Sequence, residues 1–273
     1  MSSEHLSKSP LGKQSAYISN YDPGQLCPIP RELTWKAYAY SKSPYYGFDI
    51  WNAYEISWLN VKGLPQVAIG EFYVPLTSPN LIESKSLKLY LNSFSQTKFI
   101  NEDKVQKTLV SDLSLCAGEA VKVKLFAVNN RHVDVQEFEG SCIDEIDVDI
   151  DFYSRNDGLL NCTGKQVRGE KVYSHLLKTN CPVTGQPDWG SIFIKYSGKS
   201  IKHDSLLKYI VSYRNESDFH EHCIEKIFLD IMHQCRPYEL TVYARYLRRG
   251  GLDINPYRST ENDLPLNFRS IRQ

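Results

Sequence analysis

The chain has 273 residues, of which 41% are apolar and 12% aromatic, enough to build the cores of one or two globular domains. Lys and Arg total 32, and so do Asp and Glu, so no net positive charge attracts a polyanion and we expect no direct nucleic-acid partner. No apolar run approaches the ~20 residues of a membrane span, and the polar start lacks the apolar core of a secretion signal, so we expect no membrane partner and a cytoplasmic location.

Periodicity in the first half of the chain predicts strands, then helices, then strands. Apolar residues alternate with polar ones in the expected strands, and they recur at i, i+3, i+4 and i+7 in the expected helices. The expected elements are strands over 54–58 and 70–74, helices over 87–94 and 105–113, and strands over 121–127 and 146–152.

The second half repeats this order. With a shift of 120 residues, Leu59–Val74 aligns with Thr179–Ile194, and with a shift of 119, Ser86–Phe94 aligns with Ser205–Tyr213. We therefore predict an α+β protein of two tandem modules, each an antiparallel four-stranded sheet with two helices on one face, in the order ββααββ. The predicted modules are residues 1–158 and 159–273.

Three aspartates alternate with apolar residues in the last predicted strand of the first half. Asp147, Asp149 and Asp151 suggest either a cation site or the water-facing side of an edge strand. The edge strand is the favoured interpretation, and we expect no cation there.

The cysteines and histidines raise the question of a zinc site. The seven cysteines form no C-x-x-C pair, which favours reduced thiols. His220, His222 and His233 lie near Cys223 and Cys235, but the two histidines at i and i+2 would point apart on a helix, and the spacings match no zinc motif. We therefore expect no bound metal.

The loop KTNCPVTGQPDWGS places Cys181 seven residues before Asp188 among turn-forming residues. In the alignment at 120 residues, the first half has Val61 and Ala68 at these positions. The fold alone therefore does not require a thiol and a carboxylate here, and both residues become candidates for chemistry.

A polar cluster precedes one helix in each half. Glu83, Ser84 and Lys85 are ordinary helix-capping and surface residues, but a fixed carboxylate there also suits a ligand with paired N–H donors, such as the edge of a guanine-like base. In the second half, His220 and Glu221 follow Phe219 at the start of a helix, where capping by an acid is again the simpler alternative. Two carboxylates, one from each half, would together hold a small heterocycle.

Arg248–Gly251 reads RRGG at the end of a predicted strand. A Gly pair suits a tight turn, and it would also let backbone amides approach a phosphate gripped by arginine. No G-x-G-x-x-G or P-loop motif occurs elsewhere in the chain, so this stretch is the candidate phosphate clamp.

Four motifs then stand together: ESKSLKLY at 83–90, NCPVTGQPDWG at 180–190, FHE at 219–221 and RRGGLDINPYRS at 248–259. In this combination the chain resembles the NADPH-dependent 7-cyano-7-deazaguanine reductases, the nitrile reductases of queuosine biosynthesis, in their long two-module form. The likeness runs from YDPGQLCPIPR at Tyr21 to the C-terminus. It implies two tandem tunnelling-fold (T-fold) modules, a homodimer, a small-molecule nitrile as substrate, two NADPH per turnover and no metal.

The resemblance also implies roles for individual residues. Cys181 matches the nucleophile and Asp188 the proton donor, with His220 also near the reacting centre; the reaction would be a four-electron reduction of the nitrile through a covalent thioimide. Substrate contacts would come from Ile82, Glu83, Ser84, His220 and Glu221, and NADPH contacts from Ser84, Lys85, Arg249 and Gly250. Three residues depart from the family pattern: Cys27, His222 and Tyr257.

Three other functions stay open on the sequence. A Cys-dependent nitrile hydrolase would form the same thioimide but attack it with water, and it would need a carboxylate base and a lysine beside the cysteine. A zinc cyclohydrolase on the same fold would lose activity on chelation. A non-catalytic binding module would be unaffected by Cys181→Ala.

Overall fold

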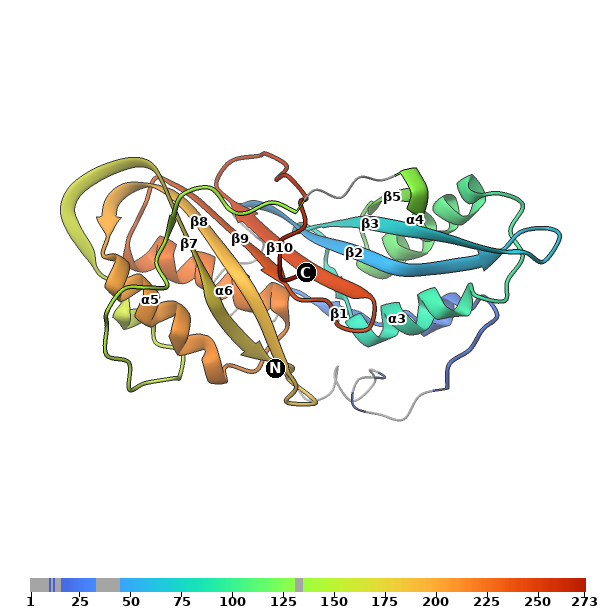
Figure 1. Cartoon of the computed structure of the whole chain (residues 1–273), viewed down its shortest axis with the longest axis horizontal. Helices are drawn as coiled ribbons and strands as arrows, with labels where there is room; N and C mark the ends of the chain where they lie inside the picture. Colours follow the sequence, from blue (N-terminus) through green and yellow to red (C-terminus); the bar gives the residue numbers. More distant parts are fainter. Residues whose placement is uncertain (1–9, 11, 13–15, 33–44, 131–134) are drawn as a thin grey trace. The chain divides into compact units, whose positions relative to one another are not determined.

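The computed structural model describes residues 10, 12, 16–32, 45–130 and 135–273, and the chain divides into two compact units (Figure 1). The first unit comprises Met1–Ser43, Phe48–Val133 and Arg248–Asp253. The second comprises Pro44–Gly47, Asp134–Leu247 and Ile254–Gln273. Each unit is described below by itself.

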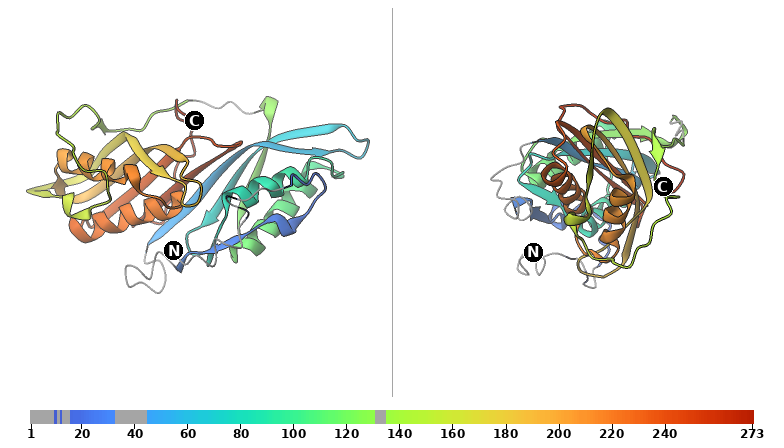
Figure 2. Two further views of the ribbon diagram at one scale, coloured as in Figure 1. Left: turned by 90° about the horizontal axis from the view of Figure 1, so that it is seen from below. Right: turned by 90° about the vertical axis from the view of Figure 1, so that its left-hand side faces the viewer.

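The first unit combines an antiparallel sheet with two helices. Strands β2 (Tyr46–Leu59), β3 (Pro65–Pro75) and β5 (Lys122–Ala127) pair in the order β5-β3-β2, and β1 (Pro28–Pro30) pairs separately with β4 (Asn80–Ile82). Helices α3 (Ser84–Ser93) and α4 (Glu102–Ala117) lie on one face of this sheet (Figure 2). Their apolar stripes form the core, in which Val105, Leu109 and Leu113 are fully buried.

The second unit repeats the arrangement with more strands. In space the order is β10 (Leu252–Ser259), β9 (Glu239–Tyr246), β8 (Pro187–Ile201), β7 (Cys162–Asn180) and β6 (Ser141–Cys142). Neighbouring strands in this order are antiparallel, except that β6 runs parallel to β7. Helices α5 (His203–Ser212) and α6 (His220–Gln234) cover one face of the sheet (Figure 2). Short 3-10 turns are η1 (Pro23–Gln25), η2 (Val128–Asn130), η3 (Asp157–Leu159) and η4 (Tyr213–Asn215).

The mixed α+β architecture and the helices predicted from periodicity are confirmed. Helices α3 and α5 begin and end 119 residues apart, which is the shift read from the sequence. The expected strand over 146–152 is wrong: this stretch has no regular structure, although Asp147, Asp149 and Asp151 are exposed as alternation requires. Alternation needs only an extended chain on a surface, whereas a strand also needs an edge with unpaired backbone groups.

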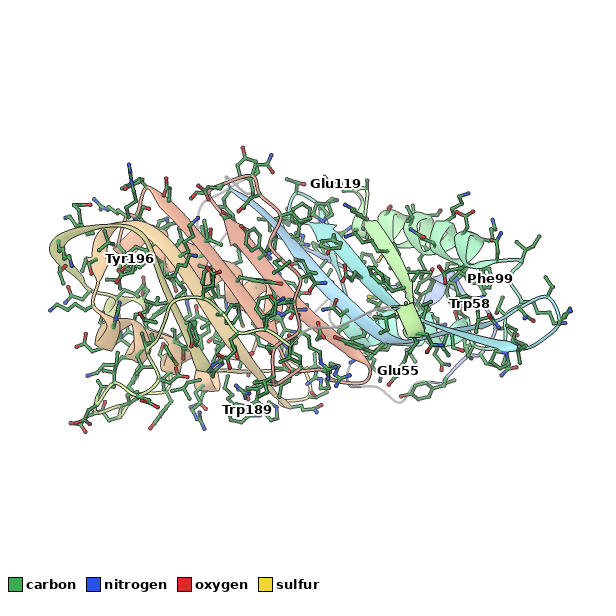
Figure 3. All side chains as sticks on the ribbon, turned by 45° about the horizontal axis from the view of Figure 1, so that its top comes forward. Glu55, Trp58, Phe99, Glu119, Trp189 and Tyr196 are labelled. Atoms are coloured by element: carbon green, nitrogen blue, oxygen red, sulfur yellow. The ribbon has the colours of Figure 1, made fainter. Side chains whose placement is uncertain are left out.

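The hydrogen bonds of the two hairpins correct the alignment around Cys181. Leu59 bonds through its backbone to Thr97 and Phe99, and Asn180 bonds in the same way to Glu216 and Asp218. Trp58 and Phe99 mark this end of the first hairpin in Figure 3. Asn180 therefore takes the place of Leu59, a shift of 121 rather than 120.

Beyond the hairpin loop, the offset between equivalent residues of the two units grows by one more residue. Leu59 pairs with Pro65 whereas Asn180 pairs with Pro187, so the second loop is one residue longer. The counterparts of Cys181 and Asp188 are consequently Asn60 and Gln66, and the assignment to Val61 and Ala68 is wrong. The inference drawn from it holds, since neither true counterpart is a thiol or a carboxylate.

The described residues contain no membrane-spanning helix, no metal-binding cluster and no disulfide. None of their helices is long and apolar enough to cross a membrane. No group of three or more His, Cys, Asp or Glu side chains among them could hold a metal ion. All seven cysteines lie within the described ranges, and none forms a disulfide.

Candidate active site

Cys181 is positioned by the β7–β8 hairpin and by the loop that leads into α6. The backbone N–H of Asn180 donates to Glu216 O at 2.8 Å, and Asp218 N–H donates to Asn180 O at 3.2 Å. Because α6 begins two residues after Asp218, these bonds bring the hairpin loop to the N-terminus of that helix. Within the loop, Cys181 N–H donates to Gln186 O, and the residue is only 4% exposed.

Asp188 and His220 form a pair in the same unit. Asp188 is the second residue of β8 and is 7% exposed, and His220 is the first residue of α6. The imidazole Nε2 of His220 lies 3.5 Å from Oδ2 of Asp188, and 14% of the His220 side chain is exposed. Two groups that can carry protons therefore lie together, sheltered from solvent.

Glu221 is a buried acid in the first turn of α6. It is 2% exposed, and its carbonyl accepts a hydrogen bond from Nη2 of Arg258 at 3.4 Å. The N-cap residue is Phe219, whose side chain makes no capping bond. A helix end with an apolar cap and a buried acid departs from the usual polar, solvated N-terminus.

The first unit provides the comparison for these positions. Helices α4 and α6 have Asn101 and Phe219 as their N-cap residues, so His220 and Glu221 correspond to Glu102 and Asp103. Both are exposed, and Asn101 caps α4 in the ordinary way by accepting from Lys104 N. The residues that correspond to Cys181 and Asp188, Asn60 and Gln66, are half-buried. Only the second unit therefore buries polar groups at three of these positions, Cys181, Asp188 and Glu221, with His220 14% exposed beside them.

In the first unit, Glu83 is a fully buried N-cap. Its Oε1 accepts from Lys85 N at 2.7 Å and its Oε2 from Ser86 N at 2.8 Å, so the capping alternative describes what this carboxylate does in the structure. Each carboxylate oxygen can accept a second hydrogen bond, so capping leaves acceptor capacity for a ligand. Lys202, the N-cap of α5 in the second unit, makes no such bond.

The neighbours of Glu83 lie on the same short stretch. Ile82 ends β4 and is buried, and the hydroxyl of Ser84 lies 3.5 Å from Oε1 of Glu83. Lys85 donates from Nζ to Pro10 O at 3.0 Å. The β1–β4 ladder fixes this stretch, since Glu83 N–H donates to Cys27 O.

The turn that ends the first unit has the backbone expected of its glycines. Gly250 and Gly251 have φ values of 61° and 72°, a region that L-residues rarely adopt. A Cβ on Gly250 would lie 3.3 Å from Cδ of Lys88, and the guanidinium of Arg248 lies 4.7 Å from the ring centroid of Tyr54. Lys88 ends the Glu-Ser-Lys-x-x-Lys cluster, but no role of its own is predicted for it from the sequence, although its i+3 spacing from Lys85 on α3 was the available signal.

The three residues that differ from the family pattern, Cys27, His222 and Tyr257, lie in different parts of the structure. Cys27 serves through its backbone, as described above, and Tyr257 donates its hydroxyl hydrogen bond to Asp263. His222 is buried in α6 with Nδ1 3.1 Å from Oδ1 of Asp218. Burial alone would raise the pKa of Asp218, but His222 and Lys226 outweigh it and lower that pKa to about 2.

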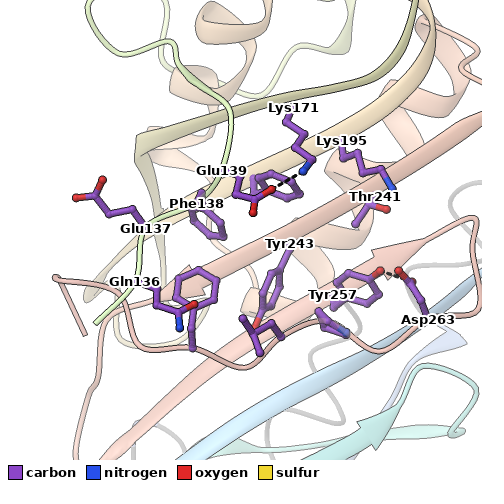
Figure 4. Close-up of a pocket in the computed structure, with 14 residues that line it drawn as sticks. Gln136, Glu137, Phe138, Glu139, Lys171, Lys195, Thr241, Tyr243, Tyr257 and Asp263 are labelled. Carbon is purple, nitrogen blue, oxygen red and sulfur yellow. Dashed lines mark hydrogen bonds and ion pairs between the residues drawn. The ribbon is translucent and has the colours of Figure 1, made fainter. Parts of the chain in front are cut away.

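A separate cavity of about 330 Å³ lies on the sheet of the second unit (Figure 4). Its walls include Phe138 and the neighbouring residues Tyr243 and Tyr257, with Lys171 paired to Glu139 at its rim. None of the site residues predicted from the sequence lines it.

The structure thus groups the predicted residues by unit. Asp188, His220 and the buried Glu221 lie around the start of α6 beside the loop that carries Cys181. The remaining predicted residues all belong to the first unit: Ile82, Glu83, Ser84, Lys85, Arg249 and Gly250.

Comparisons with known proteins identify the family of the chain. The family described as "Nitrile reductase, 7-cyano-7-deazaguanine-reductase N-term" matches residues 17–125, and the family described as "QueF-like protein" matches residues 187–264. Proteins named NADPH-dependent 7-cyano-7-deazaguanine reductase from two strains of Coxiella burnetii, CbuK_Q154 and Dugway 5J108-111, are each 53% identical over 271 residues, covering 97% of this chain and 97% of the relative. The chain belongs to the NADPH-dependent 7-cyano-7-deazaguanine reductase family.

Among solved structures, the crystal structure of the archaeosine synthase QueF-Like in the apo form aligns with 38% of this chain and 99% of its own. Its TM-score is 0.31 and its sequence identity 16%. Membership of the reductase family rests instead on the full-length sequence relatives.

Proposed function

We propose that this protein catalyses the NADPH-dependent four-electron reduction of the nitrile of 7-cyano-7-deazaguanine to an aminomethyl group, a step in the biosynthesis of queuosine for tRNA. The observation that carries the proposal is the burial of Cys181, Asp188 and Glu221 beside His220 in the second unit, at positions where the first unit has exposed or half-buried residues. The family relationship supplies the substrate and the reductant.

The nitrile carbon is a poor acceptor of hydride, so nucleophilic catalysis is the first step. The thiolate of Cys181 adds to this carbon, the carbon–nitrogen triple bond becomes a double bond, and the nitrogen gains negative charge. Asp188, acting as an acid, gives a proton to that nitrogen, and the product is a thioimide attached to Cys181. General acid help of this kind is typically worth about 10²–10⁴-fold in rate.

The later steps break the bond to sulfur. NADPH, when bound, supplies one hydride to the thioimide carbon and a second molecule supplies another to the imine that forms when the Cys181 thiolate leaves. With two hydrides and two protons the nitrile becomes a primary amine. His220, 3.5 Å from Asp188, is placed to return a proton to that carboxylate or to donate one itself. A buried site protects the imine from hydrolysis.

Residues of the first unit would hold the cofactor, and those present fit one. Lys85 and Arg249 supply positive charge, Ser84 supplies a hydroxyl, and the positive-φ turn at Gly250 offers an approach to backbone amides, all of which suit the phosphates of a dinucleotide. Lys88 lies against Gly250 and adds to this positive charge.

The deazaguanine ring would be held by acids. Glu221 and Glu83 can accept the N–H groups of the base, with Ile82, Ser84 and His220 as further contacts. Glu83 would do so from the N-cap position of α3.

The finer architecture is part of the same proposal. Strands with a pair of helices on one face, in an order of elements that both units repeat, support assignment to the tandem tunnelling fold, with modules 1–158 and 159–273. We expect a cytoplasmic homodimer without a bound metal.

Mass spectrometry of the protein incubated with 7-cyano-7-deazaguanine, without NADPH, tests the proposal. We expect a mass gain located on Cys181, none in Cys181→Ala, and an unchanged gain in the control Cys142→Ser, which alters an exposed thiol of the same unit. NADPH added to the wild type should then be consumed at two molecules per amine formed. An unmodified thiol under turnover conditions would refute the covalent mechanism.

The same assay separates the alternatives. Ammonia released from the nitrile without NADPH would indicate a hydrolase. Loss of activity after treatment with a chelator would indicate a zinc enzyme. Binding of the base that survives Cys181→Ala, with no NADPH consumption by the wild type, would indicate a binding module.

A further inference from the structure

Tyr246, at the end of β9, lies directly beneath the imidazole of His220. The two ring centroids are 4.0 Å apart, and the ring planes meet at 50°. Tyr246 is 1% exposed, so its ring is enclosed on all sides by protein. His220 therefore rests on an aromatic surface contributed by the sheet, while its Nε2 faces Asp188.

The neighbouring strand is shaped to admit this ring. Gly190 on β8 is the cross-strand partner of Tyr246, and a Cβ at Gly190 would lie 3.1 Å from Cδ1 of Tyr246. Asp188 precedes Gly190 by two residues, so both face the same side of the sheet as Tyr246. One side of the sheet thus carries the Asp188 carboxylate, the position of Gly190, which has no side chain, and the Tyr246 ring next to one another.

The hydroxyl of Tyr246 contributes little that the ring does not. It makes no well-formed hydrogen bond with a described residue, although the buried hydroxyl of Thr179 lies near enough to interact with it. Burial, together with the nearby Cys223, raises the pKa of Tyr246, so its hydroxyl stays protonated. Burying a hydroxyl that lacks a good hydrogen bond lowers the stability of the fold by about 1–3 kcal/mol. Phenylalanine at this position would not carry that cost.

We propose that Tyr246 is a positioning residue for the nitrile reduction: its ring holds the His220 imidazole in the orientation that faces Asp188. The inference rests on the proposed function, because it concerns how His220 serves Asp188 in proton transfer. Tyr246 itself touches neither the nitrile nor the reductant in this scheme. Its contribution is to keep the imidazole from turning away, and misplacement of a catalytic group by about 1 Å can cost on the order of 10²-fold in rate.

Steady-state kinetics of Tyr246→Leu and Tyr246→Phe test this. We expect Tyr246→Leu to lower kcat by about 10- to 100-fold while the KM values for nitrile and NADPH stay within about twofold, because alignment rather than binding is lost. Tyr246→Phe keeps the ring and should restore kcat to within about threefold of the wild type, with equal or higher thermal stability. The matched control is Tyr243→Leu, which removes a buried tyrosine from the opposite face of the same strand and should leave kcat unchanged.

A second variant covers the case in which Tyr246→Leu fails to fold. Gly190→Ala keeps the ring but pushes on it, since the added Cβ would lie 3.1 Å from Cδ1 of Tyr246 and 3.3 Å from Arg245 O. We expect a folded protein with lowered kcat and unchanged KM.

The outcomes separate the two proposals. If the wild type forms no adduct on Cys181 and consumes no NADPH, the proposed function fails. If the wild type is active and Tyr246→Leu matches it in kcat, or if Tyr246→Phe loses as much as Tyr246→Leu, the positioning role of the ring is refuted. A kcat loss in Tyr243→Leu equal to that in Tyr246→Leu would also refute it, since the effect would then be one of general stability.

Discussion

Asp188 shows how much one residue's surroundings decide. Its counterpart in the first unit, Gln66, occupies the same place in a hairpin but is half-buried and near an exposed loop, whereas Asp188 is 7% exposed and faces His220. The same position of the hairpin is therefore half-buried in one unit and buried beside a histidine in the other.

Replacement of Asp188 by asparagine should remove the acid while keeping its shape. We expect Asp188→Asn to lower kcat by about 10²–10⁴-fold and to slow formation of the adduct on Cys181, because no group would then protonate the nitrile nitrogen efficiently. The control Asp149→Asn changes an exposed aspartate and should leave turnover unchanged. Turnover of Asp188→Asn within a few-fold of the wild type would assign the proton to another group.

At the scale of elements, Glu83 caps a helix, and we propose that it also binds the base; the sequence presented these two roles as alternatives. Its two oxygens cap α3, which a glutamate at this place does with no ligand present. That helix end is also where a buried charge would meet the base. Capping bonds alone do not exclude the second task, because a carboxylate can accept about four hydrogen bonds in all.

Two substitutions separate these tasks. Glu83→Ala should lower the free energy of unfolding by about 1 kcal/mol through loss of the cap and should also raise the KM for the nitrile. Glu83→Gln keeps one capping oxygen but presents N–H donors to a base that also donates, so it should raise the KM with a smaller loss of stability.

The matched control for Glu83 is Asn101→Ala, which removes the cap of the neighbouring helix α4. Urea unfolding should show a similar loss of about 1 kcal/mol, and kinetics should show an unchanged KM. If Glu83→Gln leaves the KM as in the wild type, Glu83 is a structural cap alone.

The elements themselves could be predicted because their signals lie in short windows. Helices α3, α4, α5 and α6 follow the i, i+3, i+4, i+7 pattern, which one turn of backbone imposes regardless of the rest of the fold. The strand predicted over 146–152 was wrong for the opposite reason. Alternation of apolar and polar residues is local, but strand pairing depends on a distant strand with an unpaired edge.

At the scale of the whole molecule, acid stability should depend on a buried charge network of the second unit. Asp218 contacts His222 at 3.1 Å and Lys226 at 2.9 Å, and Lys226 also reaches Glu216 at 2.7 Å. The pKa of Asp218 is lowered from 3.8 to about 2, as these contacts outweigh the effect of burial. Its stabilising contribution is therefore complete above about pH 4 and is lost as the pH falls toward 2.

The shift corresponds to a contribution on the order of 2 kcal/mol at neutral pH. We expect urea unfolding between pH 6 and pH 2 to show this loss in the wild type, and Asp218→Asn to be less stable at pH 6 with a flatter dependence on pH. The exposed Asp204→Asn should follow the wild-type curve. A wild-type curve as flat as that of Asp218→Asn would show that the network does not control acid stability.

The sequence by itself determined the repeated order of elements, the motifs at 83–90, 180–190, 219–221 and 248–259, and through them the family. These features depend on local periodicity and on residue identity, which are visible without a fold. Tertiary structure alone decided the strand register that makes Asn60 the counterpart of Cys181, the burial of Glu221, and the contact between His220 and Tyr246 next to Gly190. Each of these joins residues far apart in the chain through strand register and packing, and no short window of sequence contains that information.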